Sequence, residues 1–251
     1  MANEVVQRGI VGRALAALGF AADGSQSTPA GLRVGRYGEG YAMPVFPDMG
    51  VPADEGTYFC VNNNQTGLAT AASPQSFSAT NPFLLIYNRD AQPNGKRIYL
   101  DYAMIIASAA GGGGGTSVQV AVTIDTGNRY SSGGTEITSS IANPNLDASG
   151  GSVARVFGGN VTAAAASTSV RTIVGDRALK GAIAAALDSY LLKFGAVDNH
   201  MLTSSNGSLF TSMQGLPKIV VGPNESALIH LWCPAQTAAS TFYPEMGWIE
   251  R

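Results

Sequence analysis

The sequence predicts an all-β protein built as a two-sheet antiparallel sandwich, with a jelly roll as its favoured connectivity. Three observations predict this class. About eight to ten runs alternate apolar and polar residues, or are apolar throughout, as strands are. Clusters rich in Gly, Pro and Asn separate these runs, and no strand–helix–strand alternation is found. We also find no repeat of fixed period, which argues against a propeller or a solenoid.

The N-terminal region differs from the rest. Residues 1–55 are predicted to form an extended arm and linker, and residues 56–251 the sandwich domain. Asn3 can cap a short helix that Gly19 can end, and one face of that helix is apolar. The helix either packs on its own domain or docks on a neighbouring subunit. The arm residues predicted to form that interface are Val6, Ile10, Val11, Leu15, Leu18 and Phe20.

The strands are predicted from alternation and from flanking turn residues. Ser117–Ile124 shows the strictest alternation, which is typical of a half-buried antiparallel strand. Ala178–Phe194 is ambiguous and is interpreted as a turn of helix followed by a strand. The remaining predicted strands are Thr57–Val61, Phe83–Asn88, Arg97–Ala107, Val153–Phe157, Val170–Val174, Ile219–Val221, Ala227–Cys233 and Phe242–Ile249.

Two of these strands carry more specific predictions. In Arg97–Ala107, regular alternation would place Ile98, Leu100, Tyr102, Met104 and Ile106 on one face. In Ala227–Cys233 both faces are largely apolar, so neither is expected to meet bulk water. The strand lies either under a covering loop or at a subunit interface, and the residues predicted for that interface are Leu228 and Trp232.

Low charge is the clearest feature of the composition. Asp, Glu, Lys and Arg make up 13% of the residues, about half the usual share of roughly 25%. Hydrophobic residues make up 45%, so the chain can build a core. A surface so poor in charge is easier to explain if other protein covers much of it. The composition therefore favours self-association.

Charge distribution and apolar patterning argue against other classes of partner. The net charge is −2 and the basic residues are not clustered, which argues against a nucleic-acid arm and a polybasic membrane surface. The uncharged stretch from Tyr102 to Ile124 includes a run of glycines, so a membrane helix is not expected. We expect no targeting segment. Cys60 and Cys233 are expected to be reduced, buried thiols, with a disulfide as the alternative.

Motifs for chemistry are sparse. The run Gly111–Gly115 lacks the lysine of a phosphate-binding loop and joins two predicted strands. His200 and His230 are the only histidines, and no spacing indicates that Cys60 and His230 form a nucleophile pair. No metal-ligand spacing occurs. The sequence therefore predicts a non-catalytic protein with no cofactor and no metal.

Acidic residues leave two alternatives open. Loop acids such as Asp125, Asp147 and Asp198 could bind calcium, but none has the spacing of an EF-hand loop. A glycosidase needs only two carboxylates that the fold brings together. The acids near predicted strands that could form such a pair are Asp101, Glu136, Glu225 and Glu245.

Three stretches resemble virion structural proteins of tailed bacteriophages. They are KRIYLDYAMIIASAAGGGGGTSVQVAVTIDTGNRYSSGG, VVGPNESALIHLWCPAQTAASTFYPEMGWIER with its W-x-E-R-like ending, and QRGIVGRALAALGF at the opening. The resemblance covers residues 57–251 and the arm. It implies a jelly-roll capsid decoration, cement or minor capsid protein, often a homotrimer, which joins neighbouring capsomers through terminal arms. It defines no site residues.

The function expected from these observations is structural. The protein would bind copies of itself and the major capsid protein or another virion protein, and so stabilise the particle. Its place would be the virion, assembled in the host cytoplasm. The alternative is a glycan-binding jelly-roll module of a phage fibre or an adhesin, in which an aromatic residue such as Tyr130 would lie exposed beside polar loop groups.

Overall fold

The chain divides into two compact units, Met1–Asp48 and Met49–Arg251, so the division falls before the expected boundary at residue 55. In the first unit, the described residues form an antiparallel pair, β1 (Leu32–Val34) and β2 (Gly40–Ala42). The helix expected after Asn3 lies outside the described residues. The computed structural model describes residues 32–34, 40–42, 50–62, 71–91, 95–114, 117–148, 150–197, 200–203 and 210–251.

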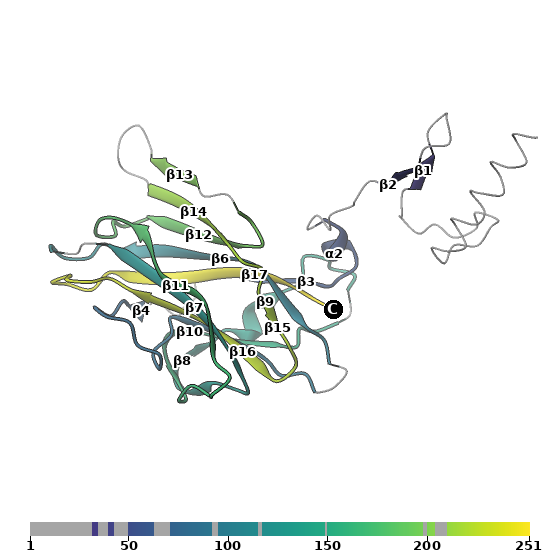
Figure 1. Cartoon of the computed structure of the whole chain (residues 1–251), viewed down its shortest axis with the longest axis horizontal. Helices are drawn as coiled ribbons and strands as arrows, with labels where there is room; N and C mark the ends of the chain where they lie inside the picture. The colour runs from purple at the N-terminus through teal and green to yellow at the C-terminus, as the bar shows by residue number, and fades with distance from the viewer. Residues whose placement is uncertain are drawn as a thin grey trace, which may run out of the picture. The chain divides into compact units, whose positions relative to one another are not determined.

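The second unit is a sandwich of two β-sheets, which confirms the predicted fold class (Figure 1). One sheet has six strands in the order β11-β7-β16-β5-β10-β8, and all its described pairs are antiparallel. These strands are β5 (Leu84–Asn88), β7 (Val118–Thr126), β8 (Tyr130–Glu136), β10 (Ala154–Ala163), β11 (Arg171–Lys180) and β16 (Glu225–Trp232).

The other sheet has nine strands, seven of them in the order β13-β14-β12-β6-β17-β3-β9, while β15 pairs with β6 and β4 with β17. Its pair β12–β14 is parallel, and its other described pairs are antiparallel. A short helix, α2 (Gly50–Asp54), precedes it, and a 3₁₀ turn, η1 (Thr138–Ser140), leads into β9. The strands are β3 (Tyr58–Val61), β4 (Ala71–Ala72), β6 (Ile98–Ala109), β9 (Ile141–Ala142), β12 (Ser189–Phe194), β13 (His200–Thr203), β14 (Phe210–Leu216), β15 (Val220–Val221) and β17 (Thr241–Glu250).

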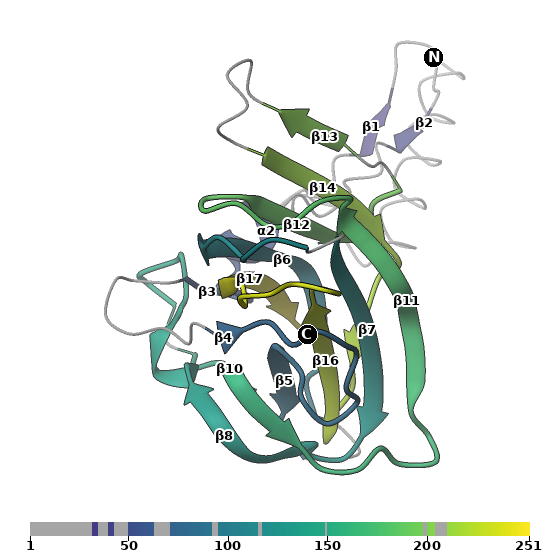
Figure 2. The same cartoon turned by 90° about the vertical axis from the view of Figure 1, so that its left-hand side faces the viewer.

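The core lies between the sheets. Figure 2 shows β12 and β6 of the nine-stranded sheet above β5, β10 and β8 of the six-stranded sheet. Val118, Val120 and Val122 of β7 are fully buried in this core, on the face that alternation predicts. Trp248 and Phe242 of β17 enter it from the opposite sheet. Burying side chains of this size contributes about 1.5–3 kcal/mol each.

A β-bulge overturns the predicted alternation of β6. Gly247 pairs with Tyr102 and the next residue, Trp248, pairs with Leu100, so Asp101 is an extra residue in β6. An extra residue reverses the alternation beyond it, because successive side chains point to opposite faces. The core residues of β6 are therefore Ile98 and Leu100 before the bulge, then Ala103, Ile105 and Ala107 after it. The prediction that Tyr102, Met104 and Ile106 share the face of Ile98 and Leu100 is wrong.

Two further expectations have separate outcomes. The strand at the end of Ala178–Phe194 is β12, but residues 181–188 form turns rather than a turn of helix. The jelly-roll connectivity remains a prediction. In the six-stranded sheet β16 lies between β5 and β7, so neighbours in the sheet are distant along the chain. The sheets have six and nine strands, however, where a jelly roll has eight in all.

Candidate functional site

The outer face of the nine-stranded sheet carries rows of half-buried side chains. Strand register places Leu191 beside Met104 in one row and Ser189 beside Ile106 in the next. In the part of the chain that the structure describes, no helix or strand crosses this face. We call its apolar residues the outer apolar patch. They are Tyr99, Tyr102, Met104, Ile106, Leu191, Met213, Tyr243 and Ile249.

The bulge in β6 builds a polar cluster beside this patch. Asp101 pairs with Lys193 at 2.6 Å, between Oδ1 and Nζ, and accepts a hydrogen bond of 3.1 Å from the Tyr58 hydroxyl. Burial and then the Asp101 charge raise the pKa of Tyr58 far above its usual value. Tyr58 and the Tyr102 ring both crowd the α-carbon of Gly247, where a Cβ would overlap them. Only glycine therefore fits at this position.

Glu245 is a half-buried carboxylate at the edge of the patch. Burial raises its pKa, and among the described residues it has no ion-pair partner. Burial, and then the Glu245 charge, raise the pKa of the Cys60 thiol as well. A raised pKa lowers the thiolate fraction, so Cys60 is not an activated nucleophile. His230 lies on the opposite sheet, so the fold does not bring together the pair considered from the sequence.

The four candidate carboxylates are divided between the two sheets. Glu136 forms a two-pronged ion pair with Arg155, at 2.9 and 2.8 Å, on the six-stranded sheet. Glu225, on the same sheet, accepts from the Gly222 backbone N–H at 2.7 Å. Asp101 and Glu245 share the nine-stranded sheet, where Asp101 is held in the ion pair with Lys193 and burial raises the pKa of Glu245.

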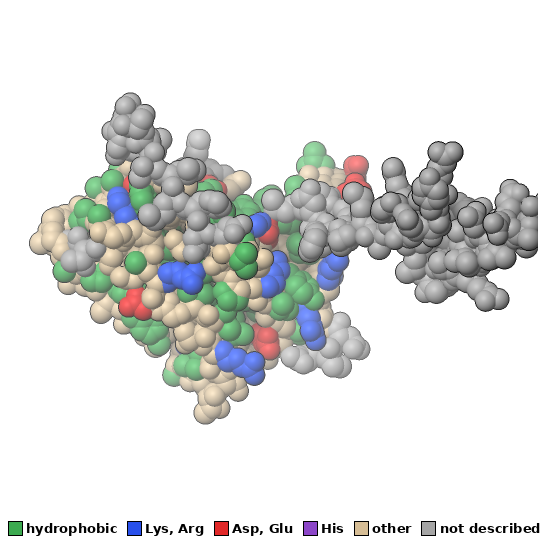
Figure 3. Space-filling view, turned by 45° about the horizontal axis from the view of Figure 1, so that its top comes forward, with side chains coloured by type: hydrophobic (Ala, Val, Ile, Leu, Met, Phe, Trp, Pro, Cys, Tyr) green, Lys and Arg blue, Asp and Glu red, His purple; other side chains and the backbone are tan. Residues whose placement is uncertain are grey.

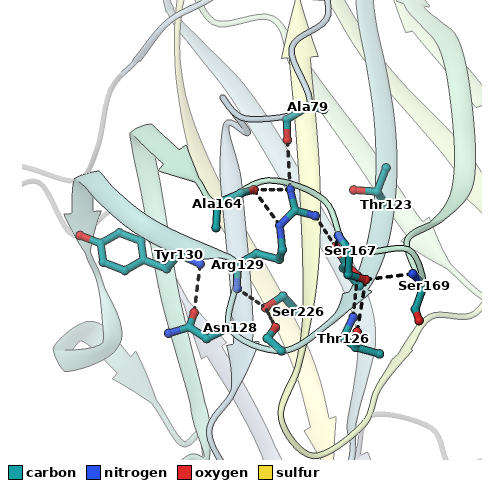
Figure 4. A network of polar contacts seen from close by, with 12 residues as sticks. Ala79, Thr123, Thr126, Asn128, Arg129, Tyr130, Ala164, Ser167, Ser169 and Ser226 are labelled. Atoms are coloured by element: carbon teal, nitrogen blue, oxygen red, sulfur yellow. Dashed lines mark hydrogen bonds and ion pairs between the residues drawn. The ribbon is translucent and has the colours of Figure 1, made fainter.

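On the six-stranded sheet, Arg129 forms a buried clamp with Asp125 (Figure 4). Its Nη1 lies 2.5 Å from Asp125 Oδ2, and the two side chains are 4% and 0% exposed. Its other guanidinium nitrogens donate to the carbonyl of Ala164, at 2.9 and 2.7 Å, and to that of Ala79, at 3.4 Å. Its backbone N–H donates to Ser226 Oγ. One side chain thus ties together the turn after β7, the connection after β10 and the segment before β5.

Asp125 completes the clamp. Burial alone would raise its pKa, but hydrogen bonds from Ser167, Arg129 and Thr126 outweigh burial and hold the pKa below its usual value. Its oxygens are occupied by donors of this chain, so they are not available for a calcium ion. Asp147 lies exposed in a turn, and Asp198 lies outside the described residues. The described residues contain no group of three or more metal-ligating side chains.

The apolar outer face of β16 is covered by the chain itself. Residues 73–83, which we call the covering segment, are tied to this strand at both ends, where Cys233 N–H donates to Pro74 and Phe83 N–H donates to Ile229. The Phe77 ring lies 5.0 Å from His230 and 5.5 Å from Trp232, between ring centroids. The sequence left two interpretations of this strand open, a covering loop or a subunit interface. In the structure, a loop of the same chain covers the strand.

The cover over β16 can be compared with the prediction that residues of this strand and of the arm form a subunit interface. Leu228 is 0% and Trp232 is 6% exposed, so their surface is already covered within one chain and the interface prediction gains no support there. The predicted arm residues, from Val6 to Phe20, lie outside the described residues. The outer apolar patch was not anticipated, because the bulge that turns Tyr102, Met104 and Ile106 outward leaves no mark in the alternation.

His230 lies buried beneath the covering segment. Its Nε2 is 3.3 Å from Thr123 Oγ1, and its Nδ1 has no hydrogen-bond partner. Burial lowers its pKa to about 4, because it outweighs the raising effect of the Ser78 backbone, and the Arg129 charge lowers the pKa a little further. The ring is therefore neutral at physiological pH and packed among aromatic residues, which is not the setting of a general base. His200 is in β13.

One ring face of Tyr130, the aromatic residue considered for glycan stacking, is covered by another aromatic side chain. Tyr130 stacks on Phe157, with centroids 3.8 Å apart and an interplanar angle of 11°. Arg155 lies over the Phe157 ring at 5.0 Å. Tyr130 is half-buried in this cluster, so one of its faces cannot stack on a sugar.

The thiols, the helices and the surface charge of the described chain complete the description of possible sites. Cys233 is buried and Cys60 half-buried, and both are free thiols. No helix of the described part is long and apolar enough to span a membrane. On the face shown in Figure 3, Lys and Arg side chains are spaced apart among hydrophobic and uncharged ones. Comparison with protein-family models, curated proteins and solved structures found no match to this chain.

Proposed function

We propose that this protein is a non-catalytic structural subunit that associates with copies of itself through the outer apolar patch. The observation that carries the proposal is that a row of apolar side chains at the centre of a sheet has no cover among the described residues. Patches of this kind on a folded domain are typical of protein–protein interfaces. Glu245 gives the patch a half-buried charge for which a partner chain could supply the counter-ion.

The low charge of the whole chain supports the same proposal. Only 13% of its residues are charged, and the acids considered for catalysis are apart or neutralised by basic partners. The finer proposal is the one that the sequence resemblance implies. The protein would be a cement, decoration or minor capsid protein of a tailed bacteriophage, a trimer that binds the major capsid protein in the virion.

Native mass tests the self-association. We expect light scattering after size-exclusion chromatography to give a stable trimer or larger assembly. Replacing Leu191 or Met104 by Asp should dissociate it, because an unpaired charge would be buried in the interface. Thr135→Asp, an exposed position on β8, is the matched control and should keep the native mass. A monomer at all concentrations would overturn the proposal.

The capsid proposal has a test of its own. The purified protein should sediment with empty phage capsid shells, and the Leu191→Asp variant should bind them less tightly if trimer formation supports lattice binding. Self-association without binding to any capsid shell from the protein's own source would refute the virion assignment. The proposal of a self-associating structural subunit would then still stand.

A further inference from the structure

A cavity of about 400 Å³ opens at the margin of the sandwich, away from the outer apolar patch. Four parts of the chain line it: residues 71–74, residues 81–83, residues 159–162 of β10 and Leu231 of β16. Its apolar lining includes Phe83 and Leu231, both almost fully buried. A volume of this size is within the range of small-molecule sites, which is roughly 300–1,000 Å³.

The cavity lies where the regular ladder between β10 and β5 ends. The ladder between β10 and β5 ends at the pair Gly158–Leu84. The pairing of β10 with β8 then shifts register before Val161, and Gly159 has a φ of +92°. A positive φ here favours glycine, so this bulge is encoded in the sequence. Val161 turns to the cluster on the outer sheet face, which leaves Asn160 on the side of the cavity.

The polar groups at the cavity are free. The side chains of Asn81, Asn160 and Thr162 are exposed, and none makes a hydrogen bond within the described part of the chain. Ser73 is the exception, since its hydroxyl is held by Gln236 and Ser240. Two carboxamides and a hydroxyl therefore offer donors and acceptors together, beside an apolar floor.

The charge of the lining limits the ligand. Among the described residues that line the cavity there is no Asp, Glu, Lys, Arg or His, so this lining offers a counter-charge to neither an anion nor a cation. One edge of β10 is paired with β8 along this stretch, at Val161–Gly133 and Thr162–Ser132. On its other edge the Gly159 and Ala163 N–H groups donate to the carbonyls of Phe83 and Thr80. Both edges are therefore engaged around the cavity, which leaves little free strand edge to which a peptide could add.

We propose that this cavity binds a neutral saccharide. Paired hydroxyls of a sugar match the paired donor and acceptor of a carboxamide, and the apolar floor suits the C–H face of a ring. Phe83 is 5% exposed, so the sugar would be held through its hydroxyls rather than by aromatic stacking. This inference does not depend on self-association. Saccharide binding would be a second role of the structural subunit.

Saturation-transfer NMR with the full-length protein tests the proposal. The probes are neutral oligosaccharides built from glucose, galactose, mannose or N-acetylglucosamine, with sialylated and uronic-acid oligosaccharides as the charged comparison. One arm uses fragments of bacterial surface polysaccharides and the other uses glycans released from glycoproteins, which separates the two sources. We expect at least one neutral probe to bind and the charged probes to bind more weakly.

Two variants place the binding in this cavity. Asn160→Asp and Asn81→Asp keep the size of the side chain but replace its donors with a charge, and each should weaken binding about tenfold. Asn62→Asp makes the same change at an exposed position outside the cavity and should leave binding unchanged. Circular dichroism checks that all three variants fold. Failure of every neutral probe to bind, or equal binding by Asn160→Asp and Asn62→Asp, would overturn the proposal.

Discussion

The two sheets of the sandwich both present apolar side chains on their outer faces, but among the described residues only one face is covered by another segment. On the six-stranded sheet, the covering segment packs Phe77 against His230 and Trp232 and is tied down at Ala79 by Arg129. On the nine-stranded sheet, Leu191 and Met104 remain half-buried, with no described helix or strand over them. An apolar outer face can therefore arise in two ways: the first sheet extends the core outward, and the second sheet is the one for which we propose a partner.

The difference also separates two kinds of charge. The covered face holds an ion pair whose groups are 4% and 0% exposed, so its loss is a matter of folding. The uncovered face holds Glu245 without an ion-pair partner among the described residues, so in the proposed assembly a partner chain would supply its counter-charge. Four predictions test this distinction, in order of the effect that we expect.

Removing the clamp should have the largest effect. Arg129→Ala would leave the Asp125 carboxylate buried without its cation and release the covering segment at Ala79. We expect a loss of about 3–5 kcal/mol in the free energy of unfolding, measured by urea denaturation. Arg155→Ala removes an arginine from a partly exposed ion pair with Glu136 and should cost about 1 kcal/mol or less. Equal losses would contradict the covering role of the clamp.

Truncating one leucine on each face compares the faces directly. Leu228→Ala should cost about 3 kcal/mol, because it empties a fully buried position. Leu191→Ala should cost only about 1 kcal/mol in a dilute sample, since this side chain is half-buried. At high protein concentration the second loss should grow, because self-association stabilises the folded state. Concentration-independent values for both variants would remove the contrast between the faces.

Acidification should weaken the covered face through His230. The pKa of this ring is about 4 in the folded protein and 6.5 in an ordinary setting, so only the unfolded chain binds the proton between these values. Stability should therefore fall as the pH drops below 6.5, by about 2 kcal/mol from this residue at pH 4.5. The charged group that faces the ring is Arg129, with Thr123, Phe77 and Trp232 around it.

The measurement for this prediction is urea unfolding at pH 7.0, 5.5 and 4.5. His230→Gln cannot take up a proton and should lose less stability over that range than the natural protein. Parallel pH profiles for the two proteins would show that other groups cause the acid sensitivity.

The smallest effect is expected on the uncovered face. Tyr58→Phe deletes the hydrogen bond to Asp101 but keeps the Lys193 ion pair, so it should cost about 1 kcal/mol in thermal or urea unfolding. Tyr99→Phe is the matched control, because the Tyr99 hydroxyl makes no hydrogen bond in the described structure. A Tyr58→Phe loss no larger than that of the control would show that the cluster adds nothing to stability.

Strands with apolar alternation were predictable from the sequence, whereas strands without it were not. Alternation in Ser117–Ile124 identified β7 and its inward valines. In contrast β8, Tyr130–Glu136, is an edge strand of mostly exposed Ser, Gly and Thr, and it has no apolar alternation to detect. Strand β14 was missed as well, although it lies inside its sheet between β13 and β12. Its buried positions include the polar residues Ser212 and Gln214, so apolar alternation does not mark its inward face.

The sites depend on contacts that no local pattern records. Asp125 and Arg129 are four residues apart around a turn, and this spacing is the only local sign of the clamp. The clamp also needs Ala79 and Ala164, which supply backbone carbonyls and could be almost any residue type. The outer apolar patch depends on the extra residue at Asp101, and a single inserted residue leaves the composition of a strand unchanged.

The strand order has a consequence for how the chain is made. In each sheet a late strand lies in the interior: β16 between β5 and β7, and β17 between β6 and β3. During synthesis, the earlier strands emerge from the ribosome with a gap where these two belong, so neither sheet can be completed until residues 225–250 have been translated. Such non-local pairing makes the folding of this domain slow. Nascent chains should therefore stay dependent on chaperones until β16 and β17 have emerged, and a chain that is cut before residue 225 should yield no stable fragment.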